Sequence, residues 1–255
     1  MLWYKSWLET RWRFVIGLTV LACMAAGAVI AYPRVAALLP LVPAAGTGGE
    51  IGRRLREIAE LERDYRGYVW VQWFRQNLAQ LGTLFAVLLG TGNPLTGGSG
   101  GAALFTLSLP ASRQRLVGVR TATRLAQWLA LAVVPSLLIP LLSPIVGQTY
   151  GVGDALVHGL CMFMAGAIYF SLAVLLSTVF DDIWRPLLIA LCAAFVVVAV
   201  EQVFRDALPP SVFHIMSGEL YFRSGVVPWQ GLIVSAAASA AMLYAAMINV
   251  ARRDF

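Results

Sequence analysis

Residue types that most catalytic and binding sites require are scarce in this chain. Among its 255 residues there are two histidines, three cysteines and a single lysine, and charged residues make up 13% of the total. A phosphate-binding loop of the form G-x-x-x-x-G-K-[ST] needs a lysine after glycines, and the only lysine, Lys5, lies in a tryptophan-rich segment. We therefore expect no ATP hydrolysis by this chain itself.

Ligands for metals and redox groups are equally few. The sequence holds no H-E-x-x-H motif and no pair of cysteines at ligand spacing. Cys23, Cys161 and Cys192 all fall within apolar runs, where cysteine behaves as a small hydrophobic residue. The two histidines, His158 and His214, are far apart in the sequence. We expect no metal site, no cofactor and no redox chemistry in this chain.

Long apolar runs, in contrast, dominate the sequence. Hydrophobic residues make up 59% of the chain and the mean hydropathy is +0.75, well above the values of a soluble domain. A helix needs about 20 apolar residues to cross the hydrocarbon layer of a membrane. Six stretches approach this length: residues 14–32, 69–91, 124–147, 155–179, 186–204 and 229–250. Because no alternating pattern indicates a barrel, we predict an all-α integral membrane protein with six transmembrane helices in one domain, 1–255.

The placement of basic residues predicts the orientation. Six spans put both termini on one side of the membrane, and that side carries ten arginine and lysine residues against eight on the other. Basic residues are enriched in cytoplasmic loops. We therefore expect a multi-pass protein of the inner, cytoplasmic membrane, with both termini in the cytoplasm.

Two further segments are predicted to lie on the membrane surface. In residues 2–13, tryptophans gather on one side and charged residues form a row on another, which is typical of an interfacial amphipathic helix. In residues 50–66, apolar residues recur at helical spacing after a capping-box pattern from Thr47 to Glu50. The first would precede span one on the cytoplasmic side, and the second would lie on the extracytoplasmic side.

A serine in a glycine-rich string raises the alternative of a membrane enzyme. Residues 97–101 read GGSGG, which fits both the nucleophile-elbow pattern and the G-x-S-G of rhomboid intramembrane proteases. A serine nucleophile needs a base within hydrogen-bond reach. The order of the spans places Ser99 on the opposite side of the membrane from His158 and His214, across about 30 Å of hydrocarbon. A flexible glycine-rich connection is therefore the favoured interpretation.

Polar side chains interrupt two of the predicted spans. They are Gln72, Arg75, Gln76, Gln80 and Thr83 in the second span and Glu201 in the fifth. Polar groups within a span usually face the bundle interior or a water-filled cavity. All but Thr83 are candidates for a substrate path, in which Arg75 and Glu201 would pair. Alternatively, Arg75 reaches the outer interface among tryptophans and Glu201 pairs with Arg205.

The basic loop between spans two and three carries the most specific motif. Its sequence, LFTLSLPASRQRLVGVR, resembles the corresponding segment of type 2 ABC (ATP-binding cassette) exporter permeases. The tryptophan-rich start of the chain is similar to the elbow helix of that family. The segments YVWVQWFRQNLAQL and FHIMSGELYFRSGVVPW resemble its second-span entry and its last loop. Pro110 disfavours continuation of a preceding helix, so a new short helix can begin near it.

The resemblance implies a function for the loop and for the chain. Residues 106–120 would form a coupling segment that contacts a separate ATPase subunit, through Leu107, Ser108, Leu109, Pro110, Ser112 and Arg113. The chain would be the non-catalytic permease subunit of an exporter, paired with a second copy or a paralogue, while the ATPase subunit binds ATP and Mg. Its other partners would be membrane lipids and no nucleic acid. A secondary transporter is a further alternative, and the loop arginines would then only anchor the chain to anionic lipid.

Overall fold

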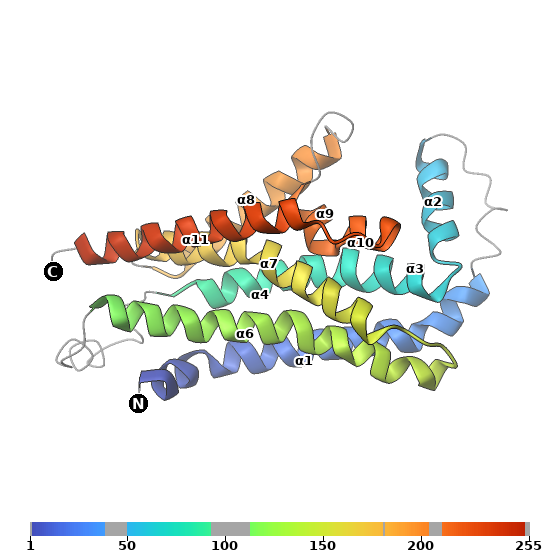
Figure 1. Ribbon diagram of the computed structural model, residues 1–255, viewed down its shortest axis with the longest axis horizontal. Helices are drawn as coiled ribbons and strands as arrows, with labels where there is room; N and C mark the ends of the chain where they lie inside the picture. Colours follow the sequence, from blue (N-terminus) through green and yellow to red (C-terminus); the bar gives the residue numbers. More distant parts are fainter. Residues whose placement is uncertain (1, 39–49, 93–112, 181, 204–210, 253–255) are drawn as a thin grey trace.

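The computed structural model describes residues 2–38, 50–92, 113–180, 182–203 and 211–252, and every regular element in these ranges is a helix (Figure 1). In chain order the elements are α1 (Leu2–Leu38), α2 (Glu50–Leu61), α3 (Tyr65–Val69), the π-helix η2 (Trp70–Leu78), α4 (Ala79–Gly90), α6 (Arg113–Leu142), the 3₁₀-helix η3 (Ser143–Val146), α7 (Val152–Ser177), α8 (Trp184–Val203), α9 (Val212–Ser217), α10 (Glu219–Ser224) and α11 (Trp229–Arg252).

Five helical stretches are long and apolar enough to cross a membrane. They are Leu2–Leu38, Arg115–Val146, Val152–Ser177, Trp184–Glu201 and Trp229–Arg252. They coincide with five of the six predicted spans, which confirms the prediction of an α-helical, multi-pass membrane protein. Figure 1 shows that α1 begins and α11 ends at the same end of the bundle, whereas α2 runs across the long axis at the opposite end.

The remaining predicted span, residues 69–91, is divided among three helical segments. α3, η2 and α4 follow one another without a break from Tyr65 to Gly90. In the π-helical part each N–H bonds to a carbonyl five residues back, which widens the turns. None of the three segments alone reaches the length of a span, and together they cross the bundle beside α1 (Figure 1).

The first helix corrects the prediction of a separate elbow helix at 2–13. α1 runs from Leu2 through the predicted boundary to Leu38 as one helix. Its buried residues repeat mainly at intervals of four: Ser6, Thr10, Gly17, Leu21, Ala25 and Val29. Because this face is continuous and packs on α6, both parts of α1 are held by the same neighbour.

The third span also begins earlier than predicted. α6 starts at Arg113 and continues to Leu142, so residues 113–120 belong to this long helix and not to a separate short one. Residues 106–112 of the predicted coupling segment lie outside the described residues. The predicted surface helix 50–66 is found as α2 but ends at Leu61, because Asp64 has an extended backbone and begins the next helix.

Glycines allow α4, α6 and α7 to pack closely. A Cβ atom at Gly82 would lie 2.3 Å from Cε of Met162, and one at Gly166 would lie 2.7 Å from Cζ2 of Trp128. Trp128 is fully buried between these helices, and its Nε1 donates to the carbonyl of Phe163 at 3.2 Å. The indole therefore occupies the space that the glycines leave.

Replacement of Gly90 tests this packing. A Cβ atom at Gly90 would lie 2.5 Å from the backbone oxygen of Phe170 and 2.8 Å from Cβ of Ala173. We expect Gly90→Ala to lower the stability of the purified protein by about 1–3 kcal/mol through overpacking. Gly118→Ala, where nothing lies within 4 Å of the added atom, should raise it slightly through helix propensity. Thermal unfolding in detergent measures both, and equal melting temperatures would contradict the packing.

Candidate functional site

The predicted path residues of the second span differ in their exposure and contacts. Gln72, Arg75 and Gln76 belong to η2, and Gln80 belongs to α4. Gln76 and Gln80 are exposed, whereas Gln72 and Arg75 are half-buried. Thr83 was expected on the same face, but it is buried and its hydroxyl donates to the carbonyl of Ala79. Gln80 and Thr83 both belong to α4, where three residues turn the helix short of a full turn, so Thr83 points away from the exposed face of Gln80 and into the bundle.

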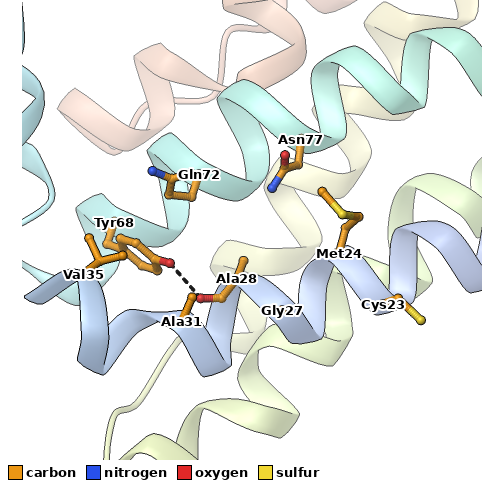
Figure 2. A pocket seen from close by; sticks show the side chains of 9 residues that line it. All are labelled: Cys23, Met24, Gly27, Ala28, Ala31, Val35, Tyr68, Gln72 and Asn77. Atoms are coloured by element: carbon orange, nitrogen blue, oxygen red, sulfur yellow. Dashed lines mark hydrogen bonds between the residues drawn. The ribbon is translucent and has the colours of Figure 1, made fainter.

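A cavity of about 300 Å³ lies between this helix and α1. Its α1 wall extends from Cys23 to Val35 and includes Gly27, and its other wall contributes Tyr68, Gln72 and Asn77. Figure 2 shows Asn77 projecting toward α1 and the Tyr68 hydroxyl donating to the carbonyl of Ala28, at 2.9 Å. The polar row therefore adjoins a space that small residues of α1 leave open.

The predicted pair of Arg75 and Glu201 is wrong for the described residues. The Arg75 guanidinium lies 5.6 Å from the ring centroid of Trp70, which agrees with its alternative placement among tryptophans. Glu201, near the end of α8, instead contacts His214, with 2.7 Å between Oε1 and Nδ1. Arg205, the other predicted partner of Glu201, lies outside the described residues.

His214 connects two carboxylates. Its Nε2 lies 3.2 Å from Oε2 of Glu219, on the side of the ring opposite Glu201. Glu219 also accepts a bond from Nε of Arg223, and Glu201 accepts a short bond from the Ser211 hydroxyl. This group is not apparent in the sequence because its members come from α8, α9, α10 and the N-cap of α9. Only the i, i+4 spacing of Glu219 and Arg223 was visible in the sequence.

One backbone carbonyl group connects the turn between the short helices α9 and α10 to the rest of the bundle. The oxygen of Ser217 accepts from Nε1 of Trp70 and faces Nδ1 of His158, at 3.0 Å in each case. Trp70 also stacks on Phe222, with ring centroids 4.5 Å apart. The next residue, Gly218, has a φ of +63°, and a Cβ there would lie 2.6 Å from His158. This turn therefore requires glycine.

A second contact joins α10 to α7. The Tyr221 hydroxyl donates to Oδ1 of Asp154 at 2.8 Å, and Nε of Arg66 lies 3.3 Å from Oδ2 of the same carboxylate. The hydrogen bond to this carboxylate raises the pKa of Tyr221 above its ordinary value. The phenol stays protonated at neutral pH, so this contact does not change with mild alkalinity.

Both histidines lie at the same end of the bundle, as the order of the spans predicts. His158 contacts the Ser217 carbonyl, and the Ser217 hydroxyl donates to the carbonyl of His214. Ser99 lies outside the described residues, so its distance from these rings stays a prediction. Each imidazole is engaged in contacts that hold the α9–α10 turn.

At the other end of the bundle, arginines converge on the end of α4. Nη1 of Arg13 donates to the carbonyls of Leu88 and Thr91, at 3.0 and 2.9 Å. Nη1 of Arg124 donates to the carbonyl of Gly92 at 3.3 Å. These carbonyls lack a backbone N–H partner within the helix, although the Thr91 hydroxyl also donates to the Leu88 carbonyl at 3.0 Å. The negative end of the helix dipole favours cations there.

Burial distinguishes this arginine cluster from a lipid anchor. Arg120 is 3% exposed and Arg124 7%, and Nη2 of Arg120 lies 3.0 Å from Oε1 of Glu9. One alternative from the sequence was that the basic residues near this loop, Arg120 and Arg124 among them, only anchor the chain to anionic lipid. The structure places them inside the bundle because α6 begins at Arg113 and carries them against α1.

Most of the predicted coupling residues cannot be compared with the structure. Leu107, Ser108, Leu109, Pro110 and Ser112 lie outside the described residues, and Arg113 is the first residue of α6. The described helices that precede and follow residues 93–112, α4 and α6, both contact α1, through Arg13 and through the ion pair of Arg120 with Glu9.

Removal of Arg13 tests the cluster. Arg13→Met keeps the length of the side chain but leaves the carbonyls of Leu88 and Thr91 without this donor, so we expect a loss of about 1–3 kcal/mol in stability. Arg11→Met, at an exposed position on the same helix, should change stability by less than about 0.5 kcal/mol. Thermal unfolding in detergent measures the difference, and equivalent effects of the two substitutions would argue against the cluster.

Comparisons with known proteins add no relative to these observations. No family model, no curated protein and no solved structure matches the chain. Within the described ranges, no group of three or more histidine, cysteine, aspartate or glutamate residues could hold a metal ion. A functional interpretation therefore depends on the geometry of the bundle and on the motifs of the sequence.

Proposed function

We propose that this chain is the permease subunit of an ATP-driven exporter, similar to type 2 ABC exporter permeases. Two such subunits would form a substrate path between them, and separate ATPase subunits would bind ATP and Mg. The observation that supports this proposal best is the polar row of the second helix, Gln72, Arg75, Gln76 and Gln80, of which Gln76 and Gln80 are exposed.

The polar row needs a polar neighbour. Gln76 and Gln80 are exposed on a helix that crosses an otherwise apolar bundle. An amide group in contact with hydrocarbon loses hydrogen bonds, so polar side chains in spans face a wet cavity or another helix. A path between two copies of the chain provides both. The cavity that Gln72 and Asn77 share with α1 would be part of this path.

A six-span topology fits the same proposal. α3, η2 and α4 together exceed the roughly 20 residues that a span requires. With this span included, the two ends of the chain lie on one side of the membrane, which agrees with their common position in Figure 1. The excess of basic residues assigns that side to the cytoplasm. α2, across the opposite end, would then lie on the extracytoplasmic surface.

The arginine cluster supports a transmitting role for the coupling segment. In the proposed exporter, ATP binding closes the ATPase subunits and moves residues 106–113. Because Arg13 and Arg124 tie the end of α4, which precedes this segment in the chain, to α1 and α6, such a movement would reach the helices that border the path. A ligand shifts a conformational equilibrium only through its different affinity for the two states. ATP would do so through the partner subunit.

Two competing interpretations predict no ATPase partner. A membrane enzyme, such as a rhomboid-like protease, would need Ser99 beside a histidine, and both histidines are engaged at the α9–α10 turn. A secondary transporter would couple transport to an ion gradient through paired acidic residues near the middle of the membrane. Glu201 lies at the end of α8 instead. A neighbouring gene that encodes an ATPase would favour the exporter over both.

The coupling segment provides the decisive experiment. Leu109→Asp places a charge where an apolar contact with the ATPase is expected, at a cost of several kcal/mol if the contact is buried. We expect co-purification with the ATPase to be lost, or its hydrolysis to be uncoupled from transport. The ATPase encoded beside the chain is the probe.

Removal of Arg113 and Arg115 is the matched control. If the loop only anchors the chain to anionic lipid, this double variant should disturb insertion, whereas Leu109→Asp should bind and couple normally. That ranking of the two variants would contradict the proposed docking role.

The polar row gives a second prediction. Gln80→Leu removes an exposed amide from the proposed path, so we expect a reduced or altered substrate stimulation of the ATPase, with assembly of the complex unchanged. Gln230→Leu, at an exposed position near the start of α11, is the control and should leave this stimulation intact. Reconstituted complexes in liposomes allow both measurements. Unchanged stimulation in Gln80→Leu would remove Gln80 from the path.

A further inference from the structure

We propose that His214 acts as a pH-sensitive latch: its protonated ring holds the end of α8 against α9 and α10, and deprotonation releases it. The latch consists of Glu201, His214 and Glu219. Its effect on transport depends on the proposed exporter function, whereas the latch itself does not.

Each nitrogen of the His214 ring faces a carboxylate oxygen. Nδ1 lies 2.7 Å from a carboxylate oxygen of Glu201, and Nε2 lies 3.2 Å from a carboxylate oxygen of Glu219. An ionised carboxylate only accepts hydrogen bonds, and a neutral imidazole donates from one nitrogen only. Both contacts are therefore favourable only when His214 is an imidazolium cation.

The charges around the ring lead to the same conclusion. Glu219 also pairs with Arg223, at 2.8 Å. With His214 protonated, two acidic and two basic groups balance. With His214 neutral, the group carries one net negative charge, and the carboxylates of Glu201 and Glu219 repel each other across the ring.

The other neighbours of the latch do not replace this charge. Tyr169 of α7 lies near Glu201, and its ring packs against Phe213 of α9 at 5.6 Å. The Ser211 hydroxyl, which carries no charge, donates to Glu201 and lies 3.3 Å from Nδ1 of His214. From α7, His158 contacts the Ser217 carbonyl and Asp154 is bound by Tyr221 and Arg66. Among the described residues of this group, His214 is therefore the one whose protonation sets the net charge.

The two sides of the latch differ in how firmly they are held. α9 and α10 are fixed by bonds that do not involve His214, from Trp70 to the Ser217 carbonyl and from Tyr221 to Asp154. α8, in contrast, leaves the long axis of the bundle (Figure 1) and exposes large apolar side chains, including Phe195 at 72% and Val203 at 73%. When the latch opens, α8 is the element that moves.

The sign of the pH dependence follows from these contacts. Histidine changes its charge between about pH 5 and pH 8. The folded, latched state binds the proton, so acid favours the closed latch and rising pH opens it. The arginine cluster at the other end contains no histidine and gives no such response, because arginine stays charged throughout this range.

The distance between α8 and α10 tests the latch. Spin labels are attached at Val200 (40% exposed) and Leu220 (50% exposed), in the full chain with Cys23, Cys161 and Cys192 replaced by alanine, and pulsed electron paramagnetic resonance is recorded in liposomes. We expect a single short distance at about pH 5.5 and a longer or broader distribution at about pH 8.5. One unchanged distribution at both pH values would overturn the proposal.

Two variants identify the responsible groups. His214→Gln should remove the pH dependence. Glu219→Gln places an amide N–H opposite Nε2, where a neutral ring can accept it, so the latch should stay closed at both pH values. A pH response that persists in His214→Gln would overturn the assignment to His214.

A second label pair and a transport assay complete the design. Labels at Leu156 of α7 and Leu220 span only the firmly held side and should give the same distance at both pH values. In the reconstituted exporter, the pH profile of transport should flatten in His214→Gln. If the chain proves not to bind an ATPase, the proposed function fails while the distance measurement still decides the latch.

Discussion

Backbone carbonyl groups at helix ends connect distant elements of this bundle. The last carbonyls of a helix have no partner within it, and in an apolar bundle each needs a donor from elsewhere. At one end, Arg13 and Arg124 donate to the carbonyls that end α4. At the other end, Trp70 and His158 meet at the carbonyl of Ser217. Each site joins three elements that are distant in the sequence, so the arrangement of the helices follows from where these donors lie.

The contacts at the end of α4 and those at the α9–α10 turn differ in chemistry. Arginine keeps its charge at any physiological pH, so the cluster around α4 is permanent. The α9–α10 end combines a permanent part, around Ser217, with the ring of His214, whose two carboxylate contacts depend on a proton. A membrane protein that moves between two states needs some contacts that persist and others that change. In this chain the two kinds of contact lie at opposite ends of the bundle. The persistent contacts of the arginine cluster are at the end of α4, which precedes the proposed coupling segment in the chain.

The second helix combines the features on which the functional proposal depends. Gln76 and Gln80 are exposed on it, Gln72 donates to Glu62, and its end is held by the arginine cluster. Apolar side chains at these positions would let the bundle face lipid on every side. Glutamines there are costly in hydrocarbon, so their exposure indicates contact with water or with another subunit. This cost is the physical basis of the proposed pairing of two copies of the chain.

The sequence alone determined the class of this protein, because apolar runs of span length with few charges leave a membrane helix as the only stable form. It also located α2 and most helix ends to within a few residues. It did not reveal that residues 2–38 form one helix, since the continuous buried face from Ser6 to Val29 has meaning only against α6. The sequence pattern placed Thr83 with the polar side chains of the second helix, whereas packing against the neighbouring helices buries it. The partners of Glu201 and Arg124 were decided by tertiary structure, since each is set by helices that meet only after folding, and a buried charge selects its partner by proximity.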